Sequence, residues 1–212
     1  MSPSISVITP VYNGEPFIER CYWSLNQQTV KDWEWVVVDD GSTDNTRTLL
    51  HQLNVRDSRI RLFRSTTNRG MGVARTRALS EARARWMVVS DIDDLSFPWR
   101  LERTIEAMTR GYDFACSLVV VADPAMRILG VRDFENPLYS ERIVTFTHPS
   151  LACSTELARR IGYSPELSTV HQIGEDKRII MTLAARHKGY YHRAPLVIHQ
   201  PSVGSLRRAI SS

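Results

Sequence analysis

Three short apolar segments in the first half of the chain each end abruptly in polar or acidic residues. They span Ile5 to Thr9, Trp33 to Val38 and Trp86 to Val89. Each has the length of one strand, and successive apolar positions are typical of strands buried on both faces of a parallel sheet. Helices are expected between them at 15–28, 43–53 and 71–84, with a short strand at 60–63. This alternation predicts an α/β fold whose central sheet is mostly parallel and flanked by helices.

The second half of the chain has a less regular pattern. We expect a helix that starts near Leu101 and is ended by Gly111, followed by a strand from Phe114 to Ala122. The remaining expected elements are helices at 154–161 and 175–188 and strands at 190–192 and 196–199. Because the chain has 212 residues and no internal repeat or evident linker, we expect one domain over 1–212.

Composition excludes several classes of protein. Apolar residues make up 42% of the chain and charged residues 24%, which is typical of a folded globular protein and excludes disorder or a fibrous fold. Lys and Arg number 27 against 23 Asp and Glu, so the formal net charge is +4. This excess suits a phosphate-bearing ligand but is too small to indicate nucleic acid, so no nucleic-acid partner is expected.

Cysteine usage and hydropathy bear on location. Cys21, Cys116 and Cys153 are odd in number and far apart, which favours a reducing compartment over a disulfide framework. No apolar stretch approaches the roughly 18 residues that span a bilayer. We therefore expect a cytoplasmic protein, with Arg207 and Arg208 available for peripheral contact with the anionic inner face of a membrane. The oligomeric state is left open.

Carboxylates gather where the expected strands end. Asp39 and Asp40 follow the second apolar segment, and Asp91, Asp93 and Asp94 follow the third. Ligands of open parallel sheets bind at the carboxyl ends of the strands, where these residues should meet. Closely spaced carboxylates repel one another at neutral pH unless a cation or proton compensates their charge. Mg²⁺ or Mn²⁺ is therefore the expected cofactor, with a diphosphate and water completing its ligand shell.

The segment from Asn68 to Arg75 opens the expected helix at 71–84 and contains two glycines. It is not a dinucleotide-binding fingerprint, because Arg75 occupies the position of the third glycine. A glycine-rich helix start with nearby arginines can still hold phosphate through backbone N–H groups and positive charge. Among the arginines of this region, we expect Arg75 to point inward.

Five motifs occur in a characteristic order. They are SVITPVYN at 6–13, VVVDDGSTD at 36–44, Asn68-x-Gly70 with Ala74-Arg75, Asp91-Ile92-Asp93-Asp94, and Pro98-x-Arg100-Leu101-Glu102. In this order and spacing they resemble the nucleotide-sugar half of family 2 glycosyltransferases of the GT-A fold, closely over residues 4–103 and more thinly to Glu175-Asp176. The resemblance implies a GT-A-like fold with a nucleotide-binding half at about 1–103 and a short acceptor-side half at about 104–212.

The same resemblance implies roles for individual residues. The implied nucleotide-binding residues are Pro10, Tyr12, Asp40, Asn68, Arg75 and Asp91. Within this set, Pro10 and Tyr12 would line the base and ribose pocket, and Asp40 would accept hydrogen bonds from the pyrimidine edge. Residues 147–150 fall where such enzymes build part of the acceptor site.

Metal binding and catalysis are implied for the acidic residues. Asp93 is the first candidate for a metal ligand, with Asp91 or Asp94 as its neighbour in the site, and His199 would be an additional ligand. Asp176 matches the catalytic base of inverting members. It lies where a helix should begin, and the helix dipole would lower its pKa and keep it ionised.

These residues together predict a metal-dependent inverting glycosyltransferase. It would move one sugar from a nucleotide sugar, with a UDP-sugar as the expected donor, to a hydroxyl of a glycan, a lipid-linked sugar or a protein. The Gln-x-x-Arg-Trp motif of processive polysaccharide synthases is missing, which favours transfer of single sugars. Two alternatives remain: a non-catalytic subunit that binds nucleotide sugars, and a sugar-phosphate nucleotidylyltransferase, although the latter would carry a glycine-rich signature where Pro10-Val11-Tyr12-Asn13 stands.

Overall fold

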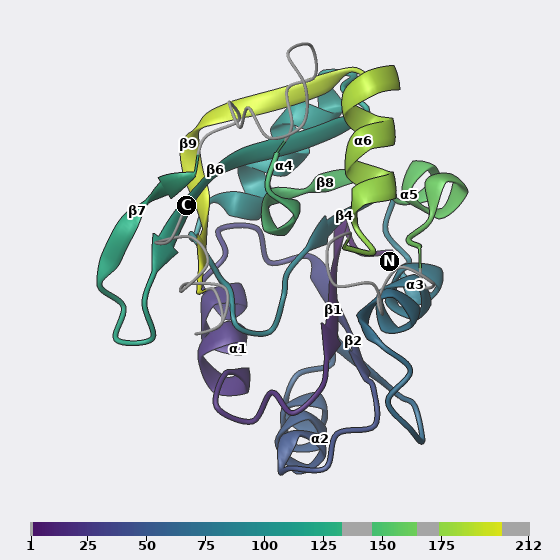
Figure 1. Cartoon of the computed structure of the whole chain (residues 1–212), viewed down its shortest axis with the longest axis vertical. Helices are drawn as coiled ribbons and strands as arrows, with labels where there is room; N and C mark the ends of the chain where they lie inside the picture. Colours follow the sequence, from purple (N-terminus) through teal and green to yellow (C-terminus); the bar gives the residue numbers. More distant parts are fainter. Residues whose placement is uncertain (1, 133–145, 165–173, 201–212) are drawn as a thin grey trace.

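The computed structural model describes residues 2–132, 146–164 and 174–200, and the statements below concern these residues. The strands are β1 (Ile5–Val11), β2 (Trp33–Asp39), β3 (Ile60–Arg64), β4 (Trp86–Val89), β5 (Leu95–Ser96), β6 (Phe114–Ala122), β7 (Ile128–Arg132), β8 (Ala152–Ser154) and β9 (Gly189–His199). The α-helices are α1 (Ile18–Asn26), α2 (Thr46–Arg56), α3 (Met71–Glu81), α4 (Arg100–Thr109), α5 (Thr155–Ile161) and α6 (Lys177–Arg186), and a 3₁₀ turn covers His148–Ser150. They form a mixed α/β fold around one sheet (Figure 1).

The sheet has the strand order β3-β2-β1-β4-β8-β6-β9-β5, and β7 pairs with β6. The first four of these strands are parallel, as the apolar pattern predicted. Beyond β4 the sheet is mixed, because the short strand β8 runs antiparallel to both of its neighbours while β6 and β9 are parallel. The expectation of a mostly parallel sheet is therefore confirmed, and each antiparallel pairing involves β5, β7 or β8. An apolar run could not predict these pairings, because it indicates burial and not strand direction.

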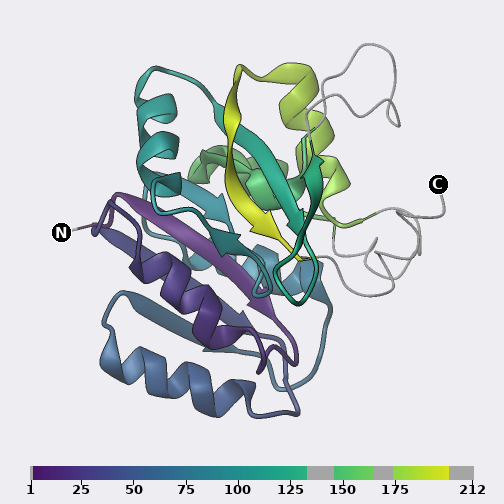
Figure 2. The ribbon, with the colours of Figure 1, turned by 90° about the vertical axis from the view of Figure 1, so that its left-hand side faces the viewer.

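Helices cover both faces of the sheet, and alternate residues of the strands supply two separate cores. On one face Val7, Val37 and Val88 pack with apolar residues of α1, α2 and α4. On the other face Ile8, Val36 and Val89 pack with α3, α5 and α6. Figure 2 shows α1, α2 and α4 on one side of the sheet and α6 on the other. Burial on both faces explains why the central strands are apolar at every position.

The carboxyl end of the molecule differs from the sequence expectation in one element. The two strands expected at 190–192 and 196–199 are one strand, β9, that runs beside β6. Its register shifts between His192, opposite Ser117, and Pro195, opposite Leu118. A proline has no backbone N–H to donate to a ladder, so a bulge at Pro195 lets the strand continue past it.

Three helices begin later than the apolar periodicity indicated, and one of them is α2, which starts at Thr46 instead of residue 43. Helix α1 starts at Ile18 instead of residue 15, because Asn13 takes a left-handed conformation with φ +52° and a turn precedes the helix. Helix α6 starts at Lys177, which leaves Glu175 and Asp176 in the turn before it. None of the helices described has the length and apolar content needed to cross a membrane. Arg207 and Arg208 lie outside the described residues.

Gly41 sits where two loops approach closely at the carboxyl end of β2. Its φ is +78°, and a Cβ at this position would lie 2.7 Å from the carbonyl carbon of Thr67 and 2.9 Å from the amide nitrogen of Asn68. Both neighbours are backbone atoms, so neither can move without displacing the loop that leads into α3. Glycine is therefore required by conformation and by space.

We expect Gly41→Ala to lower the free energy of unfolding by about 2–3 kcal/mol, measured by urea denaturation. Gly111→Ala is the matched control, because Gly111 has φ +83° but nothing within 4 Å of the added Cβ. The control should lose only about 1 kcal/mol for the left-handed conformation. Equal losses in the two variants would mean that the close approach at Gly41 contributes nothing.

Candidate active site

The loops after β1 and β2 are joined at the carboxyl edge of the sheet. The amide of Asn13 donates to Ser42 Oγ at 2.9 Å, and Asn13 Oδ1 accepts from the amide of Thr43 at 2.9 Å. Pro10 lies at the end of β1 and is buried, whereas the side chain of Tyr12 is 41% exposed. The loops after the first two strands are thus hydrogen-bonded into one surface, on which the side chain of Tyr12 is open to solvent.

Asp40 connects this surface to the start of α3. Its Oδ2 accepts from the amides of Arg69 at 2.9 Å and Gly70 at 2.7 Å. Its Oδ1 is buried and has no hydrogen-bond partner among the described residues. A buried carboxylate oxygen without a donor is costly, so a ligand that donates a hydrogen bond would stabilise this site. Asn68 is exposed, and its Oδ1 accepts from the amide of Gly70 at 3.0 Å.

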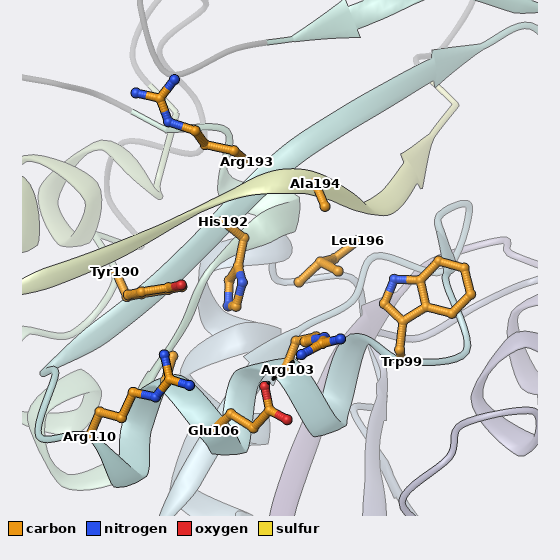
Figure 3. A pocket seen from close by; sticks show the side chains of 10 residues that line it. Trp99, Arg103, Glu106, Arg110, Tyr190, His192, Arg193, Ala194 and Leu196 are labelled. Atoms are coloured by element: carbon orange, nitrogen blue, oxygen red, sulfur yellow. Dashed lines mark hydrogen bonds and ion pairs between the residues drawn. The ribbon is translucent and has the colours of Figure 1, made fainter.

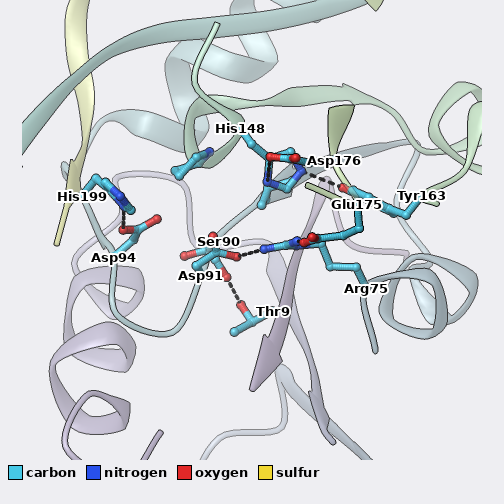
Figure 4. Close-up of polar contacts among 12 residues, drawn as sticks. Thr9, Arg75, Ser90, Asp91, Asp94, His148, Tyr163, Glu175, Asp176 and His199 are labelled. Carbon is cyan, nitrogen blue, oxygen red and sulfur yellow. Dashed lines mark hydrogen bonds and ion pairs between the residues drawn. The ribbon is translucent and has the colours of Figure 1, made fainter. Parts of the chain in front are cut away.

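Arg75 points inward from α3, as expected, and joins two carboxylates. Its guanidinium donates to Asp91 Oδ1 at 2.6 Å and forms a second ion pair with Glu175 Oε1 (Figure 4). Arg75 is 4% exposed. Burial acts to raise the pKa of Asp91, but the positive charge of Arg75 outweighs it and the pKa is lowered. One arginine therefore holds together β4, α3 and the turn before α6.

Glu175 is a site residue that sequence reasoning missed. Its neighbour Asp176 matched a family motif, and the Glu175-Asp176 pair offered no local sign that its first member would meet an arginine 100 positions earlier. A signal was present in Arg75 itself, because a buried guanidinium requires anionic partners and Asp91 alone leaves part of its hydrogen-bonding capacity unused.

Asp176 occupies the N-cap position of α6, but its side chain makes no capping hydrogen bond. Its carboxylate is 29% exposed, and its Oδ2 lies 3.9 Å from His148 Nδ1. Burial raises the pKa of Asp176, which Arg75 partly opposes. The expectation that this pKa would be lowered is therefore wrong, because burial and the neighbouring carboxylate of Glu175 disfavour the charged form. A raised pKa gives the carboxylate more affinity for a proton.

His148 is buried behind Asp176. Its Nε2 lies 3.2 Å from the hydroxyl of Tyr163, and the two rings meet edge to face. Burial, with the nearby positive charge of Arg75, lowers the pKa of His148 to about 3, so its imidazole is neutral at pH 7. The contact with Asp176 is therefore not an ion pair. It places a neutral polar ring beside the carboxylate.

The buried state of His148 predicts a pH dependence of stability. Its pKa in the folded protein is depressed, so the unfolded chain takes up a proton first as the pH falls below about 6.5. The contribution of neutral His148 to the free energy of unfolding is thus fully present above pH 7. It is lost as the pH falls toward 3, at roughly 1.4 kcal/mol per pH unit. We expect His148→Gln to have a shallower decline in the free energy of unfolding between pH 6 and pH 5. His51→Gln, at an exposed position of α2, should keep the wild-type slope. Parallel slopes in all three proteins would contradict the assignment.

The acidic segment 91–94 after β4 also contacts the end of β9, through Asp94 on the side of Asp91 away from Arg75. His199 Nδ1, from the end of β9, lies 2.7 Å from Asp94 Oδ1, and Asp94 Oδ2 is buried without a hydrogen-bond partner in the described chain. Burial and the charges of Asp94 and Asp91 raise the pKa of Asp93 to about 6. This region therefore carries negative charge that the protein does not fully compensate.

The residues of this segment fit a divalent cation as partial ligands. Oxygen atoms of Asp93 and Asp94 are the type of ligand that Mg²⁺ and Mn²⁺ prefer, and the unpartnered Asp94 Oδ2 is available. Within residues 2–132, 146–164 and 174–200, no three His, Cys, Asp or Glu side chains converge closely enough to hold an ion by themselves. A cation here would need oxygen atoms from water or a substrate.

Arg100 holds the loop after β4 in place through buried hydrogen bonds, and it is another residue to which sequence reasoning assigned no role. It is 2% exposed and donates to the carbonyls of Val89 at 2.5 Å and Pro149 at 2.7 Å. It thereby links the end of β4 to the 3₁₀ turn that carries His148. Its motif was visible in the sequence, but its two carbonyl partners depend on the folded chain.

The candidate residues thus form a connected series along one edge of the sheet. Asp40 binds the start of α3, Arg75 of the same helix binds Asp91 and Glu175, and Asp176 follows Glu175 directly. Asp94 and His199 lie on the far side of Asp91, as Figure 4 shows. Five stretches of the chain contribute to this edge, and they combine the carboxylate of Asp176, unpartnered carboxylate oxygens and the buried cation of Arg75.

Comparison with known proteins places the chain among transferases of sugars. The family model described as glycosyl transferase family 2 matches residues 6–156. TuaG of Bacillus subtilis, named as a teichuronic acid biosynthesis glycosyltransferase, is 41% identical over 106 residues, which are 50% of this chain and 42% of TuaG. WfgD of Escherichia coli, named as a UDP-Glc:alpha-D-GlcNAc-diphosphoundecaprenol beta-1,3-glucosyltransferase, is 38% identical over 106 residues, which are 50% of this chain and 41% of WfgD. The matched part is less than half of either relative.

Solved structures show the same fold at low sequence identity. S. aureus TarS 1-349 in complex with UDP-GlcNAc matches 95% of this chain and 59% of its own, with a TM-score of 0.77 and 24% identity. The mannosyltransferase PcManGT of Pyrobaculum calidifontis, in complex with GDP-Man and Mn2+, matches 99% and 61%, with a TM-score of 0.73 and 23% identity. Since the family model covers well over half of the sequence, and the fold agrees, the chain belongs to glycosyl transferase family 2.

Proposed function

We propose that this chain is the catalytic part of an inverting glycosyltransferase that moves one sugar from a nucleotide sugar to a hydroxyl group and requires a divalent cation. One observation carries the proposal: Arg75 joins Asp91 to Glu175, and so brings the acidic segment after β4 next to the free carboxylate of Asp176. The nucleotide-binding half would be about 1–103 and the acceptor side about 104–212, in one domain.

The donor is proposed to be a UDP-sugar. Asp40 Oδ1 is a buried acceptor without a partner, and a pyrimidine ring presents an N–H that could donate to it. Pro10, Tyr12 and Asn68 lie at the same carboxyl edge and would line the base and ribose. The name of WfgD includes UDP-Glc, and TarS has been solved with UDP-GlcNAc, which supports the choice of nucleotide.

Asp93 and Asp94 are proposed to hold Mn²⁺ or Mg²⁺, with Asp91 and His199 beside them. When bound, such an ion neutralises the negative charge that develops on a departing diphosphate. The structure of PcManGT with GDP-Man and Mn2+ supports a divalent cation. Arg75, held between two carboxylates, fixes the position of Asp91 and is less available to contact phosphate directly.

Asp176 is proposed to act as the general base. An acceptor hydroxyl gives its proton to the Asp176 carboxylate while its oxygen bonds to the anomeric carbon and the bond from that carbon to the diphosphate breaks. One displacement of this kind inverts the anomeric centre. The raised pKa of Asp176 helps proton uptake, and the neutral ring of His148 adds no positive charge that would oppose it.

The acceptor is proposed to be a hydroxyl of a growing glycan, a lipid-linked sugar or a protein, bound near the turn at residues 147–150. Arg100 ties this turn to the end of β4, and His148 within it faces Asp176. The names of TuaG and WfgD, one for polysaccharide synthesis and one for a lipid-linked acceptor, support a role in glycan or glycolipid synthesis.

Release of UDP from a panel of UDP-sugars in the presence of Mn²⁺ tests this function. We expect a chelator to stop turnover and Asp93→Ala to lower it at least about 100-fold, because a cation site is worth several kcal/mol of charge stabilisation. Asp32→Ala is the control, since Asp32 is an exposed carboxylate before β2, at the opposite edge of the sheet. Binding of UDP-sugars without turnover would favour a non-catalytic subunit, and turnover equal in all three proteins would refute the cation site.

A further inference from the structure

A cavity of about 440 Å³ lies between α4 and β9 (Figure 3). Arg103 and Glu106 of α4, with Arg110 directly after the helix, form one wall, and Tyr190 and His192 of β9 form the other. Trp99, just before α4, closes one end, with Leu196 beside it. Its volume is in the range of sites for small ligands.

This cavity is on the opposite face of the sheet from Asp176. Along β9, Tyr190 packs with the core of α1, α2 and α4, whereas Tyr191 packs with the core of α3, α5 and α6. His192 is two residues from Tyr190 and shares its face. Arg75 and Asp176 belong to α3 and the start of α6, on the other face. The cavity is therefore not part of the candidate active site.

His192 brings an unused hydrogen-bonding atom into the cavity. Its Nε2 is buried and has no hydrogen-bond partner among the described residues. Figure 3 shows the imidazole extending from β9 toward α4. Burial lowers the pKa of His192, and the positive charge of Arg103 adds to this effect, so the ring is neutral at pH 7. A buried polar atom left unpaired is costly, which favours a ligand that reaches it with a hydroxyl group.

The α4 wall has an uncompensated positive charge. Arg103 pairs with Glu106 at 3.0 Å, with side chains that are 53% and 42% exposed. Arg110 forms no ion pair with any residue that the structure describes. Arg193 also borders the cavity, although Figure 3 shows it extending from the far side of β9. A guanidinium free of carboxylate partners is suited to bind a carboxylate or phosphate group.

Trp99 adds a flat apolar surface at the end of the cavity. It is 42% exposed, although its ring stacks on Phe97 at 5.5 Å. An indole with one covered and one open face offers a surface against which the C–H groups of a sugar ring can pack, while the hydroxyl groups face polar side chains. The cavity thus offers an apolar surface, a cation without an ion-pair partner in the described chain, and an imidazole whose Nε2 is unpaired.

We propose that the cavity between α4 and β9 binds a saccharide that carries an anionic group. One sugar ring would pack on Trp99, a hydroxyl further along the saccharide would pair with His192, and a carboxylate or phosphate beyond it would bind Arg110, since α4 separates Trp99 from Arg110 by about 16 Å. This inference does not depend on the proposed transfer reaction, because binding can be measured without donor or turnover.

Titration calorimetry with defined saccharides tests the proposal. The probes are three chains of six sugar units: a hyaluronan hexasaccharide for a carboxylate, a maltohexaose phosphorylated at one end for a phosphate, and maltohexaose as the neutral chain. We expect at least one anionic saccharide to bind about tenfold more tightly than maltohexaose, and Arg110→Glu to weaken that binding at least about tenfold, as expected for loss of one charged hydrogen bond. Trp99→Ala should weaken it as well. The tighter of the two anionic probes identifies the anion.

Arg56→Glu is the matched control, because Arg56 is an exposed arginine in the last turn of α2 and its substitution changes net charge equally. It should bind the saccharide as the wild type does. Should Arg110→Glu fail to fold, Arg110→Gln removes the same cation. Equal weakening in the Arg110 and Arg56 variants would overturn the proposal, because charge alone would explain it. Full displacement by inorganic phosphate or by an oligodeoxythymidylate at equal concentration would overturn it too.

Discussion

Asp176→Asn is expected to lower the rate of sugar transfer between about 10²- and 10⁴-fold while leaving the affinity for UDP unchanged. The substitution keeps the size of the side chain and its place before α6 but removes its ability to take a proton from the acceptor. Nucleotide binding should persist, because Asp40 and the start of α3 lie elsewhere along the edge. Steady-state transfer kinetics and calorimetry with UDP measure the two quantities.

Glu156→Gln provides the control for this variant. Glu156 is an exposed carboxylate in the first turn of α5, so its loss reproduces the change in charge at a helix start without touching the site. Its turnover should equal that of the wild type. If Asp176→Asn transferred sugar as fast as Glu156→Gln, Asp176 would not be the base, and the proposed mechanism would be wrong.

Arg75→Met is expected to lower the free energy of unfolding by about 3–5 kcal/mol, because it leaves two carboxylates partly buried without their cation. Asp91 and Glu175 are 16% and 17% exposed, so solvent replaces little of the lost interaction. Turnover should fall as well, since Asp91 and the turn that carries Asp176 would no longer be held together. Urea denaturation gives the first quantity.

Two further variants make the Arg75 prediction specific. Arg103→Met breaks an ion pair whose partners are 53% and 42% exposed, and such a pair contributes roughly 1 kcal/mol or less. Arg75→Met combined with Glu175→Gln should recover part of the stability, because one of the two unpaired charges is removed. An Arg75 variant as stable as the Arg103 variant would show that the buried cluster does not stabilise the fold.

Much of the amino-terminal half could be predicted from sequence. The strands at 33–38 and 86–89 and the inward direction of Arg75 agree with the structure. These features depend on local patterns, because apolar spacing sets which residues are buried and glycine marks where loops turn. The strand from Phe114 to Ala122 was also predicted with the observed bounds.

The second half was predicted less well. Glu175 and His148 acquire their roles from Arg75, Tyr163 and Asp176, which are distant in sequence. The direction of β8, and the union of two short strands into β9, depend on which strands become neighbours. No local pattern contains that information.

The amino-acid order by itself determined the central apolar strands, the presence of the helices between them and the polar residues that follow those strands, because these properties arise from neighbouring positions along the chain. Only the tertiary structure decided the partners of Arg75, the direction of the Asp176 pKa shift and the presence of the cavity beside β9. Desolvation and ion pairing depend on atoms that the fold brings together from distant positions, so their balance does not exist until the chain has folded.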